Sequence, residues 1–150
     1  MRFRFIWIGK TKDKHWKALQ EDYLERLSHF VKYDIIELKD AAKHETKEDQ
    51  GKRILALLNQ SSFNVLLDVE GECVSSHALS KLVDKWQIQG KKEVTFIIGG
   101  PEGVSSEVAE SASFRLSLSF LTFTHDMARV VLVEQLYRAY SIINGFPYQK

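Results

Sequence analysis

Residues 94–106, VTFIIGGPEGVSS, decide the fold class of this chain, because they join a strand to a helix through a glycine-rich turn. The run from Val94 to Ile98 is the most strand-like in the sequence, since its β-branched and aromatic residues suit a buried, pleated position. Ser105 or Ser106 can cap a short helix after the turn. Three glycines form the turn itself: Gly99, Gly100 and Gly103. The segment therefore predicts a strand-turn-helix unit in which a ligand can approach the backbone closely.

Strands and helices alternate on both sides of this unit. Further strands are predicted over residues 2–8, 33–38, 63–68 and 114–118. Further helices are predicted over residues 14–30, 46–58, 79–86 and 125–143, and Thr46 with Asp49 resembles a capping box. This order implies parallel crossovers, so we expect an α/β fold with a mainly parallel sheet and helices on both faces. A chain of 150 residues fits one domain, residues 1–150.

The last predicted helix is apolar around more of its circumference than one buried face requires. One explanation is a dimer interface. The other, about equally favoured by this pattern alone, is a central core helix within a monomer.

Composition excludes several classes of protein. The net charge of +1 gives no whole-protein field that could hold a polyanion, so RNA binding would need local patches. The lone Cys73 has no metal-ligand spacing around it, and we expect no metal site. Residues 1–8 are too short for a signal peptide, and no apolar run approaches the ~20 residues of a membrane span. We therefore expect a soluble, cytoplasmic protein that does not enter a membrane.

The loops that follow Leu67, Ile98 and Leu118 are the candidates for a ligand site, because ligands of parallel sheets bind beyond the carboxyl ends of strands. The dinucleotide fingerprint and the phosphate-binding loop are both absent from the sequence, so the ligand need not carry phosphates. A tight turn with no ligand is the alternative explanation of the glycines. His125 and Arg129 would share one face at the start of the last helix, where a cap or surface role is the alternative for the histidine.

Three segments together resemble the RlmH family of SPOUT methyltransferases. They are FIWIGKTK near the start, FIIGGPEGV in the middle and LSLSFLTFTHDMARVVLVEQLYRAYSIINGFPY at the end. The resemblance covers essentially the whole chain in order. It implies a C-terminal trefoil knot, a homodimer with active sites at its interface, and methylation of N3 of a pseudouridine in large-subunit ribosomal RNA.

The resemblance also implies S-adenosylmethionine as cofactor and assigns residues to it. These are Leu67, Gly99, Leu118, Ser119, Phe120, Leu121, Thr122 and Phe123, and we add Gly100 and Gly103 of the glycine-rich turn as predicted cofactor residues. The imide nitrogen of a uracil-like base carries a proton at neutral pH, so the enzyme should help to remove it or stabilise the anion. The candidates for this catalytic role are His125, Arg129, Tyr148 and Lys150.

Two positions differ from the family pattern. Thr124 stands where the family usually has proline, and Gln149 stands where its tail usually has histidine. Glutamine cannot act as a base near neutral pH, so the enzyme would be slower, would use another group or would rely on Lys150 to stabilise the anion. We expect Tyr148 and Lys150 to face RNA, with a disordered terminus as the alternative. The partner would be ribosomal RNA in the large subunit or the assembled ribosome.

A basic segment could capture the RNA. It comprises Lys10, Lys12, Lys14 and Lys17 beside Trp16, with Arg2 and Arg4 on one face of the first strand, and a solvated surface is the alternative. Two other functions stay open. One is a knotted RNA-binding or ribosome-binding protein with weak or lost methyltransferase activity. The other is an α/β enzyme that uses a nucleotide, which the missing phosphate fingerprints disfavour.

Overall fold

The computed structural model describes residues 1–40 and 43–148, so Gln149 and Lys150 lie outside the described residues. Five strands form one sheet in the order β2-β1-β4-β3-β5, and every neighbouring pair is parallel. The strands are β1 (Arg2–Ile8), β2 (Lys32–Leu38), β3 (Phe63–Cys73), β4 (Glu93–Ile98) and β5 (Phe114–Ser117). The predicted parallel α/β sheet is thereby confirmed.

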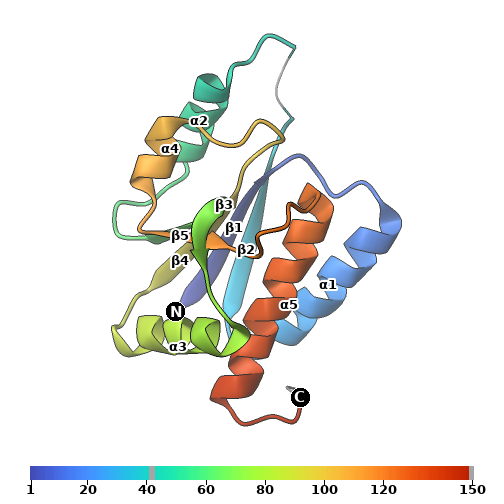
Figure 1. Cartoon of the computed structure of the whole chain (residues 1–150), viewed down its shortest axis with the longest axis vertical. Coiled ribbons are helices and arrows are strands. Elements are labelled where there is room, and N and C mark those ends of the chain that lie inside the picture. The colour runs from blue at the N-terminus through green and yellow to red at the C-terminus, as the bar shows by residue number, and fades with distance from the viewer. Residues whose placement is uncertain (41–42, 149–150) are drawn as a thin grey trace.

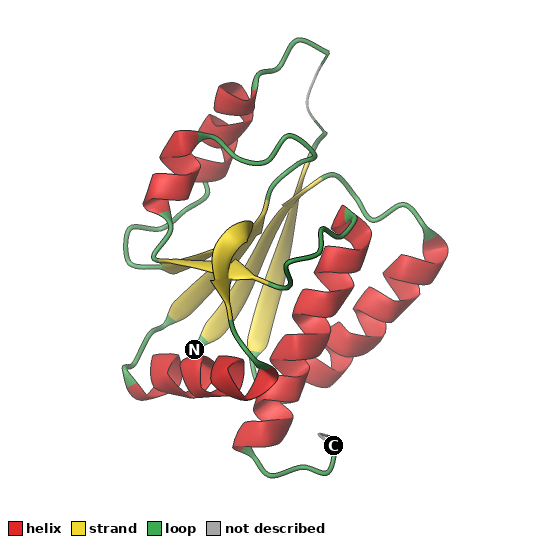
Figure 2. Cartoon of the chain, in the orientation of Figure 1, coloured by secondary structure: helices red, strands yellow, loops and turns green. Residues whose placement is uncertain are grey.

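Helices cover both faces of the sheet (Figures 1 and 2). One face carries α1 (Lys14–Ser28), α3 (Ser76–Ile88) and α5 (His125–Ile143), and the other carries the shorter α2 (Lys47–Leu55) and α4 (Ser106–Ser111). Alternate residues of the strands supply the two cores: Phe96 and Ile98 of β4 pack on the first face, and Ile97 packs on the second. This two-faced burial explains why the strands read as nearly continuous apolar runs.

Side-chain caps begin the helices where the sequence predicts them. The Thr46 side chain accepts from the Asp49 N–H, and the Asp49 carboxylate accepts from the Thr46 N–H, so the capping box is present. Ser105, rather than Ser106, caps α4. These caps satisfy N–H groups that no helical carbonyl can reach, and they fix where each loop above the sheet ends.

The strand β3 is longer than the sequence predicts. Residues beyond Asp68 had the composition of a loop, yet the strand runs to Cys73 with a register shift against β5 between Leu67 and Glu72. Such a bulge lets two stretches of one strand face the same neighbour, because extra residues are accommodated between them. A Cβ on Gly71 would come within 2.7 Å of the Arg115 carbonyl oxygen, so this close approach requires glycine.

The helix α5 is a central core helix. It packs beside both α1 and α3, and Leu132, Val133 and Leu136 are completely buried within the chain. This burial accounts for one side of its apolar surface, while Val131, Ile142 and Ile143 are only partly buried, and the dimer interface stays a prediction. The trefoil knot stays a prediction. No helix in the described part of the chain combines the length and hydropathy that crossing a membrane requires.

Candidate functional site

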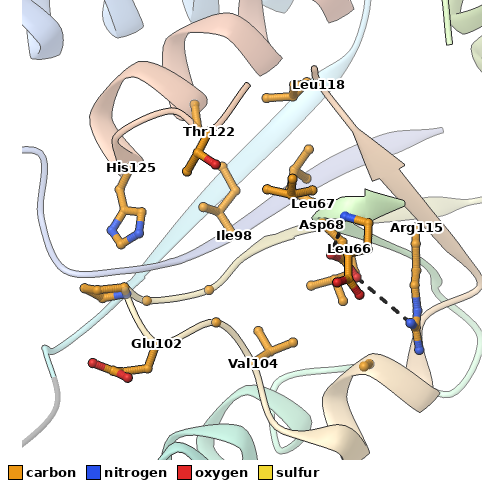
Figure 3. Close-up of a pocket in the computed structure, with 18 of the residues that line it drawn as sticks. Leu66, Leu67, Asp68, Ile98, Glu102, Val104, Arg115, Leu118, Thr122 and His125 are labelled. Carbon is orange, nitrogen blue, oxygen red and sulfur yellow. Dashed lines mark hydrogen bonds and ion pairs between the residues drawn. The ribbon is translucent and has the colours of Figure 1, made fainter. Parts of the chain in front are cut away.

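A cavity of about 710 Å³ opens at the carboxyl ends of β3, β4 and β5 (Figure 3). Its size lies within the ~300–1,000 Å³ typical of small-molecule sites. The part of β3 just after Leu67 and the loops after β4 and β5 surround it; these are the three places that the sequence singled out, although the first is strand rather than loop. The position agrees with the rule that parallel sheets bind ligands at this edge.

The floor of the cavity is apolar. Leu66 and Leu67 come from β3, Ile98 from the end of β4, and Leu118 from the residue after β5 (Figure 3). Val104 faces them from the glycine loop. A flat apolar group such as an aromatic base could replace water against these side chains at a gain of roughly 25 cal/mol per Å².

The glycine loop folds tightly against one wall. Gly100 and Gly103 form an isolated antiparallel bridge, and Gly103 has a φ of +79°, which disfavours any other residue. A Cβ on Gly99 would lie 2.6 Å from Cγ1 of Val104, too close for an unshifted loop. The glycines therefore form the tight turn that the sequence predicts, and all three line the cavity, while ligand binding by this loop stays a prediction.

Charged groups stand at the edge of the cavity opposite His125 (Figure 3). The Asp68 carboxylate lies 4.0 Å from Nη1 of Arg115 and also accepts from the Glu70 N–H at 2.9 Å. Both residues line the cavity, as do Glu102 and Lys47. Asp68 could have been found from its place at a strand end. Arg115 could not, because its place beside Asp68 depends on the pairing of β5 with β3, in which Arg115 lies opposite Leu66.

His125 begins α5 and lines the cavity at its other end. Thr124 accepts from the Met127 N–H and caps the helix, so the threonine in place of proline has a structural role. Burial lowers the pKa of the His125 imidazole below its ordinary value of 6.5, and the nearby positive charge of Arg129 lowers it further. Asp126 and Asp40 oppose this shift. The ring is therefore largely neutral at pH 7 and able to accept a proton.

Arg129 does not line the cavity. Its side chain is only 2% exposed, with Nη1 donating to Oγ1 of Thr11 at 2.9 Å and Nη2 donating to the Ile8 carbonyl oxygen at 2.5 Å. Its guanidinium also lies over the Trp7 ring, 4.9 Å from the centroid. Although it shares a helix face with His125, it turns inward toward β1. Direct contact with a substrate is not available to a side chain buried in this way.

Tyr148 packs against its own chain, beside the second half of α5. Its hydroxyl donates to Oε1 of Glu134 at 2.8 Å, and its ring meets Tyr137 edge-on with centroids 4.7 Å apart. Arg138 pairs with the same carboxylate and lies over the Tyr148 ring. Burial, with hydrogen bonds to Tyr23 and Glu134, raises the pKa of Tyr148 well above its usual range. The tail is thus anchored up to this residue.

The structure brings together most residues predicted for the cofactor. Those lining the cavity are Leu67, Gly99, Gly100, Gly103, Leu118, Ser119, Leu121, Thr122 and Phe123. Phe120 points away and is 88% exposed. Tyr148 is not among the lining residues, and Lys150 lies outside the described residues. Among the described residues no group of three or more metal-ligating side chains gathers.

Comparison with known proteins agrees with this geometry. The model of a family described as "Predicted SPOUT methyltransferase" matches residues 1–149. Ribosomal RNA large subunit methyltransferase H of Clostridium kluyveri is 39% identical, and its counterpart in Desulfotalea psychrophila is 41% identical. Each alignment covers 100% of this chain and 100% of the relative.

A solved structure shares the fold at low sequence identity. It is described as a probable methylase family protein from Haemophilus influenzae Rd KW20, with a TM-score of 0.59 and 9% identity. The match covers 99% of this chain and 70% of that chain. At this identity the likeness concerns the fold alone.

Proposed function

The chain belongs to the SPOUT methyltransferase family, and on that premise we propose that it transfers a methyl group from S-adenosylmethionine to N3 of a pseudouridine in large-subunit ribosomal RNA. The observation that carries the proposal is the cavity at the strand ends, which has His125 at one end and the glycine loop along one wall. Because relatives at about 40% identity over their full length are ribosomal RNA large subunit methyltransferases, ribosomal RNA is the substrate favoured here. Since ribosomes work in the cytoplasm, the proposal includes a cytoplasmic location.

The cavity fits S-adenosylmethionine by size and by chemistry. Its apolar floor suits an adenine ring, and the crowded Gly99 leaves backbone groups free to bind polar edges. No phosphate is needed, in agreement with the absence of a phosphate-binding loop. The residues that would hold the cofactor are Leu67, Gly99, Leu118, Ser119, Leu121, Thr122 and Phe123.

When bound, S-adenosylmethionine supplies a methyl group on a positively charged sulfur, which departs as a neutral thioether. The protein therefore needs no nucleophile of its own, and its main task is to hold the base in line with that methyl group. The rigid wall of the cavity and the capped start of α5 provide fixed elements for this purpose.

His125 is the residue we assign to proton removal. N3 of pseudouridine must lose its proton as it gains the methyl group, and a neutral ring nitrogen of His125 can accept it. The lowered pKa keeps this imidazole neutral at pH 7. Gln149 in the tail cannot serve as a base, so the proposed reaction would need a base elsewhere, and His125 is the residue we propose.

The RNA would approach across the loop before α1 and the first turn of that helix. Lys10, Lys12, Lys14 and Lys17 are all exposed there. Arg2 and Arg4 are less suited, because both pair with Asp34 at the opposite, amino end of the strands. Tyr148 and Lys150 stay predicted RNA contacts.

We further propose that the protein acts as a homodimer. Phe120 and Leu121 are 88% and 72% exposed in the loop between β5 and α5. Two large apolar side chains next to a cofactor cavity are costly to leave in water, and a second copy of this chain would cover them. This support is independent of the apolar surface of α5.

Methylation by the purified protein tests the proposal. Large subunits, assembled ribosomes and free ribosomal RNA that lack the modification are incubated with S-adenosylmethionine, and the target nucleoside is identified by mass spectrometry. We expect N3-methylated pseudouridine with at least one substrate. Tight ribosome binding without any methylated product would instead support the alternative, an RNA-binding protein that has lost catalysis.

A further inference from the structure

Arg129 joins two parts of the molecule that are far apart in the sequence. It lies one helical turn after His125 on α5, and its guanidinium bonds the Ile8 carbonyl at the end of β1 and the Thr11 hydroxyl in the following loop. Asp126 lies 3.8 Å from the same group. The start of the helix beside the cavity is therefore tied directly to the loop that precedes α1.

Thr11 is the central residue of this connection. Its side chain donates to Oε1 of Gln20 at 2.8 Å, which leaves a lone pair to accept from Arg129. Its backbone N–H donates to Oε2 of Glu37 at 3.3 Å. At 7% exposure it is buried, whereas its neighbours Lys10 and Lys12 are exposed. One residue thus connects α1, β2 and α5 at the middle of a basic loop.

Burying a guanidinium costs free energy, so an arginine at this position indicates a role that an apolar residue could not fill. Two neighbouring donors, Nε of Arg129 and Nε1 of Trp7, are buried without a hydrogen-bond partner among the described residues. Packing alone would be better served by a residue such as methionine. What arginine adds is a rigid fork that holds a carbonyl and a hydroxyl in a fixed relation.

We propose that Thr11 and Arg129 are positioning residues, and that their buried hydrogen bond fixes the basic loop relative to the cavity so that captured RNA meets the start of α5 in register. The inference rests on the proposed function for its RNA partner. Neither residue touches the cofactor cavity or the surface, so both act through their neighbours: Lys10 and Lys12 on one side, His125 on the other.

Thr11→Val is the most direct test, because valine keeps the shape and removes the hydroxyl. Arg129 keeps its bond to Ile8, so the cavity is retained and the affinity for S-adenosylmethionine, measured by calorimetry, stays at the wild-type value. The loop loses its bonds to both Arg129 and Gln20, and KM for large ribosomal subunits rises at least about fivefold, as expected for the loss of two buried hydrogen bonds. We expect kcat to change less than KM.

Thr95→Val is the matched control. Thr95 is also a buried threonine with a hydroxyl partner, Ser62 at 2.7 Å, but it lies within β4 and outside the cavity lining. It should lower stability to a similar extent and leave KM unchanged. If both variants change KM alike, Thr11 has only a structural role and the inference is overturned.

A double-mutant cycle with Arg129→Lys tests whether the two residues act through one bond. Lysine keeps the charge but cannot hold both acceptors in the same fork. We expect the double variant to raise KM no further than Arg129→Lys alone, whereas independent effects would multiply. Multiplying effects would contradict the inference.

Hydrogen exchange of the backbone amides of Lys10 and Lys12 provides a readout without catalysis. Thr11→Val should speed their exchange, and Thr95→Val should not. If the wild-type protein fails to methylate any ribosomal substrate, the proposed function is wrong while this measurement still decides whether the bond holds the loop. Unchanged exchange in Thr11→Val would overturn the inference by itself.

Discussion

The two arginines of α5 occupy opposite environments on one helix. Arg129, in its first half, is buried, bonds an uncharged carbonyl and hydroxyl, and has its pKa lowered by that burial. Arg138, in its second half, is half-buried, pairs with the Glu134 carboxylate, and has its pKa raised by this hydrogen bond. Arginine therefore links buried segments of the chain at one end of the helix and contacts the C-terminal tail at the other.

The difference shows how function divides along the helix. Where Arg129 lies, the helix meets the cavity, and small displacements would move His125 relative to a substrate. Where Arg138 lies, the helix contacts Tyr148, and the side chains of this contact are partly exposed to solvent. We expect changes near the first end to affect chemistry and assembly, and changes near the second end to affect mainly the anchoring of the tail.

His125→Gln should have the largest effect, at the first end. Glutamine keeps a polar side chain but cannot accept a proton near neutral pH, so kcat should fall about 10²- to 10⁴-fold. Single-turnover methyl transfer at saturating S-adenosylmethionine measures it. His29→Gln, on an exposed histidine just after α1, is the control and should leave kcat unchanged. A rate for His125→Gln within about threefold of wild type would exclude His125 as the base.

Phe120→Asp tests assembly next to the same end of α5. Removing a buried phenylalanine costs about 1.5–3 kcal/mol, and a symmetric dimer would lose two, so the dimer should dissociate at least tenfold more readily. Sedimentation at several protein concentrations measures the change. Ile88→Asp is the control, because Ile88 is also highly exposed, at 78%, but lies at the end of α3 and not in the loop between β5 and α5. Equal effects of the two variants would remove Phe120 from the interface.

The pH dependence of kcat tests the role that we assign to His125 at the first end of α5. His125 must be neutral to accept a proton, and its pKa lies below 6.5, so kcat should hold as the pH falls through 6.5. Below the pKa of His125 it should then drop about tenfold per pH unit. Rates from about pH 5 to about pH 8 check this, and a drop that begins above pH 6.5 would contradict it.

The free energy of unfolding should also depend on His125, and like kcat it should fall as the pH falls. The unfolded chain binds the His125 proton more readily than the folded chain, because the folded pKa is lowered. The contribution of this histidine to folding is therefore fully present above pH 6.5 and is lost as the pH falls. Denaturant unfolding of wild type and His125→Gln across this range should show the difference.

Tyr148→Phe should have the smallest effect, at the second end. It removes the hydroxyl bonded to Glu134 and keeps the ring against Tyr137, so unfolding should become easier by about 1 kcal/mol or less. Urea denaturation measures this value, with Tyr33→Phe on β2 as the control. Affinity for S-adenosylmethionine should not change. A loss of cofactor affinity in Tyr148→Phe would show that the tail and the cavity are coupled.

Local patterns in the sequence predicted the elements well. The Thr46–Asp49 box, the serine before α4 and the bounds of α5 all follow from interactions within a few residues, which is why the structure confirms them. The cavity followed from a rule about parallel sheets rather than from any single motif. The segments after Leu67, Ile98 and Leu118 do meet there, although the first of them continues β3 instead of forming a loop.

Contacts between distant residues were beyond such patterns. Helical spacing placed Arg129 beside His125 but could not show that it turns toward Thr11, because that depends on how α5 packs on β1. The same holds for Arg115, which the pairing of β5 with β3 brings near Asp68, and for Tyr148, which donates to Glu134. Periodicity identifies a face of a helix, while the partner on that face is a property of the tertiary fold.

The central position of α5 also has a consequence for how the chain is made. Leu132, Val133 and Leu136 are fully buried against earlier elements of the chain, so the main core cannot be completed until α5 has been synthesised. Ribosomes add roughly 5–20 residues per second, from the N-terminus onward. During synthesis the apolar surface of the earlier strands and helices therefore stays uncovered until the last helix has emerged.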